Sequence, residues 1–205
     1  MAGGSSDRVV VFLDLQNLYK GARDAFHDRQ APSRLGMVDP LRLARRLVEL
    51  SSGRGRELAG VRVYRGQPDP TRDPMGYTAN RRQQTAWERA GITVIQRPLR
   101  YPKAWPAEKA QEKGVDVALA VDFVMLGISG DYDVGILMST DTDLKPALEA
   151  VVALGGNRRP HCEVAAWTSS RAAPRLRITG TKLWCHYLRV EDYRVMVDPT
   201  DYTTR

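Results

Sequence analysis

The fold of this chain is decided by the stretch RVVVFLD (residues 8–14), in which a run of apolar, mostly β-branched residues ends in a carboxylate. Such a run predicts a buried strand of a parallel sheet. The run VGILM (134–138) has the same character and leads into STDTD (139–143). Ligands of open α/β sheets bind outside the carboxyl ends of the strands. We therefore predict that Asp14, Asp141 and Asp143 lie at one edge of a sheet.

Strand and helix patterns alternate along the rest of the chain. Further strands are predicted at residues 60–64, 92–95, 162–167 and 183–188, and helices at 17–26, 41–50, 77–90, 115–128 and 146–154. The helix at 41–50 has the clearest start, because Asp39 suits an N-cap and Pro40 a first turn. This alternation predicts an α/β fold with a mostly parallel central sheet that is covered by helices on both faces.

The chain has 205 residues, which is enough for one sizeable core. No internal repeat, low-complexity tract or linker divides it, so we predict a single domain over residues 8–190. Residues 1–7 are then expected to be a flexible leader, and residues 191–205 a C-terminal tail.

The composition suggests a cytoplasmic protein with a polyanionic partner. The formal net charge is +7 and the pI is about 9.6, and such a charge steers nucleic acids toward a protein. An arginine-rich composition also has a simpler source, a GC-rich genome. No apolar run approaches the roughly 20 residues that cross a bilayer, and the N-terminus does not resemble a secretory signal. We therefore expect no membrane partner and a location in the cytoplasm.

Four carboxylates make up the candidate site: Asp14, Asp116, Asp141 and Asp143. Asp116 belongs to the sequence KGVD (113–116), where the apolar helix at 115–128 begins. Carboxylates that crowd together without bases raise one another's pKa. A divalent cation relieves this repulsion, and Mg²⁺ or Mn²⁺ prefers carboxylate and water oxygens. The four residues therefore predict a Mg²⁺ or Mn²⁺ site and metal-assisted phosphoester chemistry.

Each of these carboxylates also has a structural interpretation. Asp14 and one of the pair Asp141 and Asp143 suit helix N-caps, and Asp116 in a first turn favours the positive end of a helix dipole. Asp122 lies on the same helix as Asp116 but faces roughly 120° away, because a helix turns about 100° per residue. We therefore expect Asp122 to contact a neighbouring element rather than to bind a metal.

Polar neighbours of the carboxylates are candidates for substrate binding. Asn17 follows Asp14 within one turn, and Thr140 and Thr142 flank Asp141, so all three are expected to position a phosphate or the waters of a metal ion. Lys113 precedes Asp116 and is expected to neutralise developing negative charge.

A second candidate for substrate binding is the segment RPLRYPKAWP (97–106), which mixes cations with aromatic residues. Aromatic faces stack on unpaired bases while cations contact phosphates, so Arg97, Arg100, Tyr101 and Lys103 are expected to guide a single strand. The alternative is a proline-stiffened loop whose Tyr101 and Trp105 pin it to the core.

These motifs together resemble the NYN domain family of the PIN-like nuclease superfamily. The resemblance rests on DLQN (14–17), KGVDVALAVD (113–122), and YDV (132–134) leading to STDTDLKP (139–146), with GQP (66–68) as a further turn. It implies a Rossmann-like α/β/α sandwich in which Asp14, Asp116, Asp141 and Asp143 bind Mg²⁺ or Mn²⁺ and cleave RNA. Thr140 stands where the family usually has serine or glycine, and Leu144 where it has an aromatic residue. Neither difference removes a metal ligand.

Several other functions compete with a metal-dependent ribonuclease. A weakly active or inactive RNA-binding or adaptor protein with the same fold is the main alternative, and a homodimer or a protein partner is compatible with both. A phosphatase of the haloacid-dehalogenase type would have Asp-x-Asp after the first strand, whereas this chain has Asp14-Leu15-Gln16. No GxxxxGK[ST] or GxGxxG motif supports a nucleotide-hydrolysing or dinucleotide-binding enzyme.

Overall fold

A computed structural model describes residues 6–28, 30–51, 55–156, 159–171 and 173–204, so residues 1–5 of the predicted leader lie outside it. Six parallel strands form one sheet in the order β3-β2-β1-β4-β5-β6. The strands are β1 (Asp7–Asp14), β2 (Arg56–Gln67), β3 (Thr93–Pro98), β4 (Val134–Met138), β5 (His161–Trp167) and β6 (Cys185–Leu188). The helices are α1 (Leu15–Phe26), α2 (Pro40–Leu50), α3 (Pro74–Arg89), α4 (Val115–Ile128), α5 (Lys145–Gly155) and α6 (Val190–Met196), with short 3₁₀ turns η1 (Ser33–Gly36) and η2 (Thr142–Leu144).

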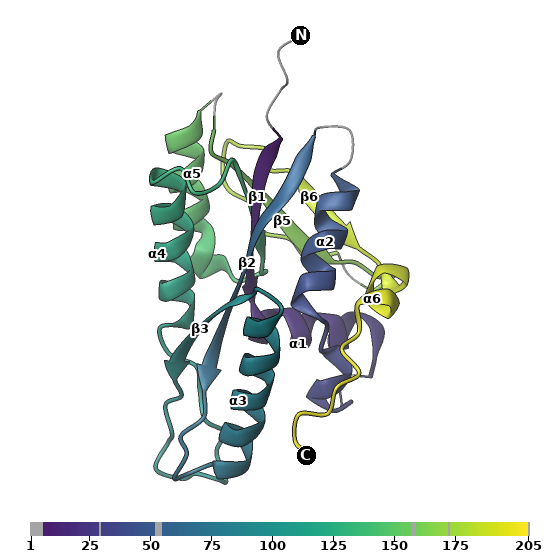
Figure 1. Cartoon of the computed structure of the whole chain (residues 1–205), viewed down its shortest axis with the longest axis vertical. Coiled ribbons are helices and arrows are strands. Elements are labelled where there is room, and N and C mark those ends of the chain that lie inside the picture. Colours follow the sequence, from purple (N-terminus) through teal and green to yellow (C-terminus); the bar gives the residue numbers. More distant parts are fainter. Residues whose placement is uncertain (1–5, 29, 52–54, 157–158, 172, 205) are drawn as a thin grey trace.

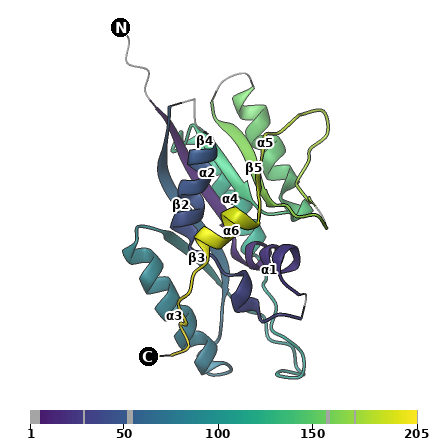
Figure 2. The same cartoon turned by 90° about the vertical axis from the view of Figure 1, so that its right-hand side faces the viewer.

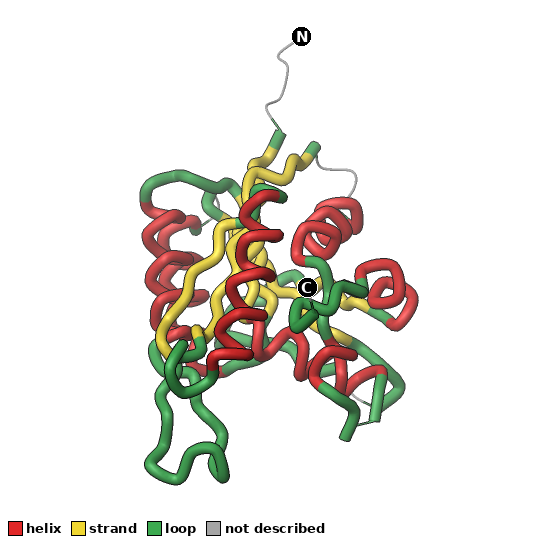
Figure 3. Tube along the Cα trace, turned by 60° about the horizontal axis from the view of Figure 1, so that its bottom comes forward, coloured by secondary structure: helices red, strands yellow, loops and turns green. Residues whose placement is uncertain are grey.

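Helices cover both faces of this sheet, which confirms the predicted α/β/α sandwich (Figures 1 and 3). The central strand β1 shows why, because its side chains alternate between two cores. Val9, Val11 and Leu13 pack with α1, α2 and α6, whereas Val10 and Phe12 pack with α4 and α5. Every residue of β1 from Val9 onward is buried, as expected for a strand inside a parallel sheet.

The predicted C-terminal tail is wrong in part, since residues 190–196 form helix α6. Tyr193 and Met196 of this helix are buried in the same core as Trp167. Asp192 accepts a hydrogen bond from Arg46 Nε at 2.8 Å and so ties α6 to α2, which lies beside it (Figure 2). The helix is too short to show a clear apolar period in the sequence, and its packing is what stabilises it.

No helix in the described part of the chain is long and apolar enough to cross a membrane.

Candidate functional site

Asp14 lies at the carboxyl end of the central strand and is only 4% exposed. Its side chain caps helix α1 by accepting a hydrogen bond from the backbone N–H of Asn17 at 3.0 Å, and its Oδ2 accepts another from Ser139 Oγ at 3.0 Å. Burial, with smaller contributions from the carboxylates of Asp116 and Glu112, raises the pKa of Asp14 to about 6 against the opposing effect of the two hydrogen bonds. The cap interpretation is therefore correct, but an N-cap does not need a buried carboxylate beside other carboxylates.

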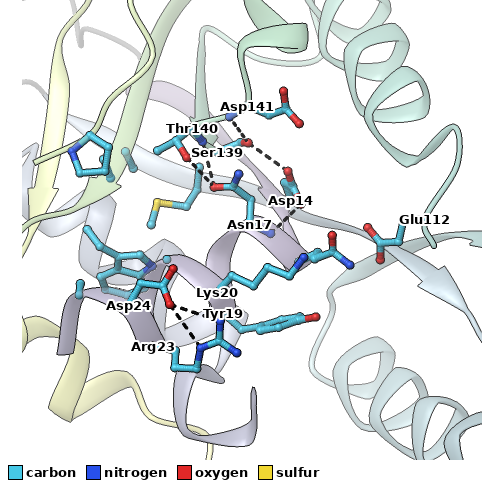
Figure 4. A pocket seen from close by; sticks show the side chains of 18 of the residues that line it. Asp14, Asn17, Tyr19, Lys20, Arg23, Asp24, Glu112, Ser139, Thr140 and Asp141 are labelled. Carbon is cyan, nitrogen blue, oxygen red and sulfur yellow. Dashed lines mark hydrogen bonds and ion pairs between the residues drawn. The ribbon is translucent and has the colours of Figure 1, made fainter. Parts of the chain in front are cut away.

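Asn17 joins the end of β1 to the loop that follows the neighbouring strand β4. Its Oδ1 accepts hydrogen bonds from both the backbone N–H and the Oγ1 of Thr140, at 3.0 and 3.1 Å (Figure 4). In the same loop, the N–H of Asp141 donates to Ser139 Oγ at 3.0 Å, and Asp141 Oδ1 accepts from the N–H of Asp143 at 3.0 Å. The two strand ends are thus held together by side chains, and the position of the Asp141 carboxylate follows from this network.

Asp116 reaches the same edge from the first turn of helix α4. The residue before that helix, Gly114, has φ of +76°, a left-handed conformation that glycine adopts without strain. Burial raises the pKa of Asp116, and the carboxylates of Asp141 and Asp143 raise it further. The Asp116 carboxylate is therefore close enough to interact electrostatically with the loop after β4.

One cavity of about 1070 Å³ brings several of the predicted site residues together. Of the twelve residues that the sequence assigns to the site, the cavity is lined by Asp14, Asn17, Asp116, Thr140 and Asp141. The other seven do not line it: Lys113, Thr142, Asp143, Arg97, Arg100, Tyr101 and Lys103. Thr142 and Asp143 are exposed on η2, next to Asp141, and Lys113 is exposed before α4. Roles for these seven in binding stay predictions.

Tyr101 makes contacts that support the structural interpretation of its loop. Its hydroxyl accepts a hydrogen bond from the N–H of Asp69 at 3.0 Å, and its ring packs edge-on against Trp105 with 4.9 Å between the centroids. The guanidinium of Arg72 lies over the same ring, 5.4 Å from its centroid. The ring thus joins its own loop to the turn after β2. Because the two segments are far apart in the chain, the sequence did not predict this contact.

Glu112 is a cavity residue that the sequence analysis missed. Its Oε1 accepts a hydrogen bond from the N–H of Gly66 at 2.6 Å, and a side chain at Gly66 would collide with Leu99. Burial raises the pKa of Glu112, and Asp116 raises it further although the bond from Gly66 opposes this. In the sequence, only its position directly before Lys113 indicated that Glu112 belongs to the site. The turn predicted at residues 66–68 is therefore wrong in part, since Gly66 and Gln67 end strand β2, and the N–H of Gly66 holds Glu112 at the cavity.

Asp122 makes the neighbour contact that was expected of it. Its Oδ2 accepts hydrogen bonds from Arg62 at 2.7 Å and from Tyr64 at 2.8 Å, so it ties α4 to β2.

The donor chemistry of the site suits a hard divalent cation. Asp14, Asp116, Asp141 and Glu112 offer carboxylate oxygens, and no ion pair to any of them occurs within the described part of the chain. Burial and, to a smaller extent, neighbouring carboxylates raise the pKa of Asp14, Asp116 and Glu112. Among the described residues, however, no three His, Cys, Asp or Glu side chains lie close enough together to hold a metal ion as they stand.

Comparisons with known proteins agree with this architecture. The family model of the NYN domain matches residues 8–158, which is most of the chain. A crystal structure of a protein of unknown function, VPA0982 from Vibrio parahaemolyticus RIMD 2210633, has the same fold with a TM-score of 0.52. The two are 16% identical, and the match covers 94% of this chain and 98% of the other. No curated protein matches in sequence. The family match and the carboxylates at the sheet edge lead to one conclusion: this chain belongs to the NYN domain family.

Proposed function

We propose that this protein is a metal-dependent ribonuclease that hydrolyses phosphodiester bonds of single-stranded RNA in the cytoplasm. One observation carries the proposal: Asp14 of β1, Asp116 of α4 and Asp141 of the loop after β4 line one cavity. Membership of the NYN family supports it, because NYN domains are generally nucleases and PIN-like nucleases usually use divalent metal ions. The net charge of +7 suits a polyanionic substrate.

The same three carboxylates, with Asp143 beside them, would hold Mg²⁺ or Mn²⁺. When bound, such an ion polarises a phosphoryl oxygen and lowers the pKa of a bound water. The protein's own contribution is to fix the ligands in advance. Ser139 and the helix cap hold the Asp14 carboxylate, and Asn17 fixes the loop that carries Asp141.

Asn17 has a second role in this proposal. Its Oδ1 already accepts two hydrogen bonds from Thr140, whereas its Nδ2 donates to no group in the described part of the chain. We therefore assign the Asn17 Nδ2 group to a phosphate oxygen of the substrate, as a neutral donor beside the carboxylates.

A family member that binds RNA without cutting it is the competing function. One observation favours it, which is that no three ligand side chains in the described part of the chain are close enough to hold a metal ion as they stand. An active enzyme would therefore have to draw Asp116 and Asp141 together around the ion.

Cleavage of labelled single-stranded RNA with Mn²⁺ or Mg²⁺, beside an EDTA control, tests the proposal. We expect Asp141→Asn to lose cutting by at least about 100-fold and to keep RNA binding, because asparagine still caps η2 but brings no charge. Asp131→Asn is the matched control, since Asp131 is exposed at the opposite end of the sheet, before β4.

The two functions predict different results. Metal-dependent cutting that Asp141→Asn lacks and Asp131→Asn retains supports the ribonuclease. RNA binding without cutting, with either metal and over several RNA sequences, supports the non-catalytic protein. Release of inorganic phosphate instead of internal cuts would contradict both.

A further inference from the structure

The cavity also extends along helix α1, where Lys20, Arg23 and Asp24 line it. The cations that line the cavity are Lys20, Arg23, Lys109 and Arg171, which we call the cation track. Lys20 and Arg23 follow Asn17 at three-residue steps, so successive turns of one helix face carry the phosphate donor and then two positive charges. At about 1.5 Å per residue, Arg23 lies about 9 Å along the helix from Asn17.

The two lysines of the track are free to bind an anion. Lys20 and Lys109 are exposed, and neither forms an ion pair within the described residues. Lys20 extends across the cavity toward the side where Glu112 lies (Figure 4). The two arginines are already engaged: Arg23 pairs with Asp24 at 3.3 Å, and Arg171 Nη1 donates to the carbonyl of His27 at 3.3 Å.

The cation track is not the basic segment that the sequence predicted to guide the RNA, residues 97–106. The segment around Arg97, Arg100 and Lys103 is basic, but none of these residues lines the cavity that holds the carboxylates. An RNA strand bound at Asp14 and Asp141 reaches the track within the same cavity. Contact with the other segment would require the strand to leave it.

We infer that Lys20 and Lys109 bind the phosphates that flank the reacting phosphate, so that the RNA runs from the carboxylates along helix α1. This inference rests on the proposed function. It specifies, in addition, on which side of the carboxylates the RNA strand binds. The substrate is then a polynucleotide with several nucleotides beyond the reacting bond, not a mononucleotide or a small phosphoester.

The salt dependence of RNA binding tests the inference. Binding of a fluorescent single-stranded oligonucleotide is measured in EDTA, where no cutting occurs, over a series of salt concentrations. Each phosphate contact contributes about 0.7 to the slope of log K against log salt for a single strand. We expect Lys20→Gln and Lys109→Gln each to weaken binding and to reduce this slope by about 0.7.

Two further variants make the test specific. Lys182→Gln removes an exposed lysine between β5 and β6 that lies outside the cavity, and it should leave the slope unchanged. Lys103→Gln tests the competing segment. The inference is overturned if Lys103→Gln reduces the slope while Lys20→Gln and Lys109→Gln do not, or if all four variants bind alike.

The wild-type protein tests the proposed function independently of these variants. Wild-type cutting with unchanged binding by Lys20→Gln and Lys109→Gln overturns the inference and leaves the ribonuclease intact. A wild-type protein that neither binds nor cuts RNA overturns the proposed function itself.

Discussion

At the scale of single residues, the buried carboxylate of Asp14 lowers the stability of the folded protein. The residue is buried at the end of β1, and its pKa is raised from 3.8 to about 6, first by burial and then by Asp116 and Glu112. The ionised form is therefore disfavoured in the folded protein. A shift of about two pKa units corresponds to about 3 kcal/mol. This conflict between burial and charge is typical of functional sites.

We predict that Asp14→Asn raises the stability of the metal-free protein at pH 8 by about 1–3 kcal/mol while it abolishes cutting. The folded protein holds the proton of Asp14 up to a higher pH than the unfolded chain does. Wild-type stability should therefore fall as the pH rises from about 4 to 6, and the variant should not share this loss. Urea unfolding of both proteins in EDTA from pH 4 to 8 measures this pH dependence of stability. A wild-type protein as stable as the variant at pH 8 would contradict the prediction.

At the scale of elements, a buried ionic cluster ties β2 to β5, two strands that are not neighbours in the sheet. Glu163 of β5 accepts hydrogen bonds from Arg56 of β2 at 2.7 and 3.0 Å, across the intervening strands β1 and β4. His186 Nε2 of β6 lies 2.7 Å from the same carboxylate. The side chains of all three are less than a tenth exposed. Their cluster therefore fixes how three strands lie relative to one another.

We predict that Glu163→Gln lowers the free energy of unfolding by about 3–5 kcal/mol, because it leaves the Arg56 charge buried without a partner. Burial by itself would raise the pKa of Glu163, but His186 and Arg56 outweigh it and lower the pKa to about 2. The stabilisation is therefore present above the ordinary value of 4.5 and is lost as the pH falls toward 2.

Chemical denaturation at pH 7 measures this effect, with Glu149→Gln on the exposed face of α5 as the control. The control should change stability by less than about 0.5 kcal/mol. Equal stability of the two variants would mean that the cluster contributes nothing to the fold.

At the scale of the whole molecule, the C-terminal residues complete the core on the α1 and α2 face. Tyr193 packs its ring against Trp167, with 6.0 Å between centroids, and donates a hydrogen bond to the carbonyl of Leu35. Beyond the helix, the carbonyls of residues 202–204 accept hydrogen bonds from Arg82 on α3. The chain end therefore contacts elements from the first half of the sequence.

We predict that deleting residues 190–205 lowers stability by at least about 3 kcal/mol, because it removes two buried hydrophobic side chains, Tyr193 and Met196. Deleting only residues 199–205 removes mainly exposed contacts and should change stability by less than about 1 kcal/mol. Thermal melting of the two shortened proteins measures the difference. If both melt alike, residues 190–196 do not stabilise the core, which agrees with the tail that the sequence predicted over residues 191–205.

Local patterns in the sequence were sufficient to predict most of the elements. Apolar runs, and an alternating pattern at residues 60–64, predicted all six strands, because a strand of a sheet is largely recognisable from its own residues. The α2 start was predicted from Asp39 and Pro40 and is confirmed, since Asp39 accepts from the N–H of Arg42 at 2.8 Å. Strand β2 is longer than predicted because Arg56 and Glu57 pair with Asp7 and Arg8 of β1, and such pairing leaves no apolar pattern.

What the sequence by itself determined is the α/β fold, the NYN family and the carboxylates at the strand ends, because each depends on residues adjacent in the chain. Only the tertiary structure decided which polar side chains face the cavity. It brought Lys20, Glu112 and Ser139 to the site and left Tyr101 in a loop contact with Asp69. The physical reason is that these placements depend on side-chain direction and on contacts between residues far apart in the chain, which no local pattern records.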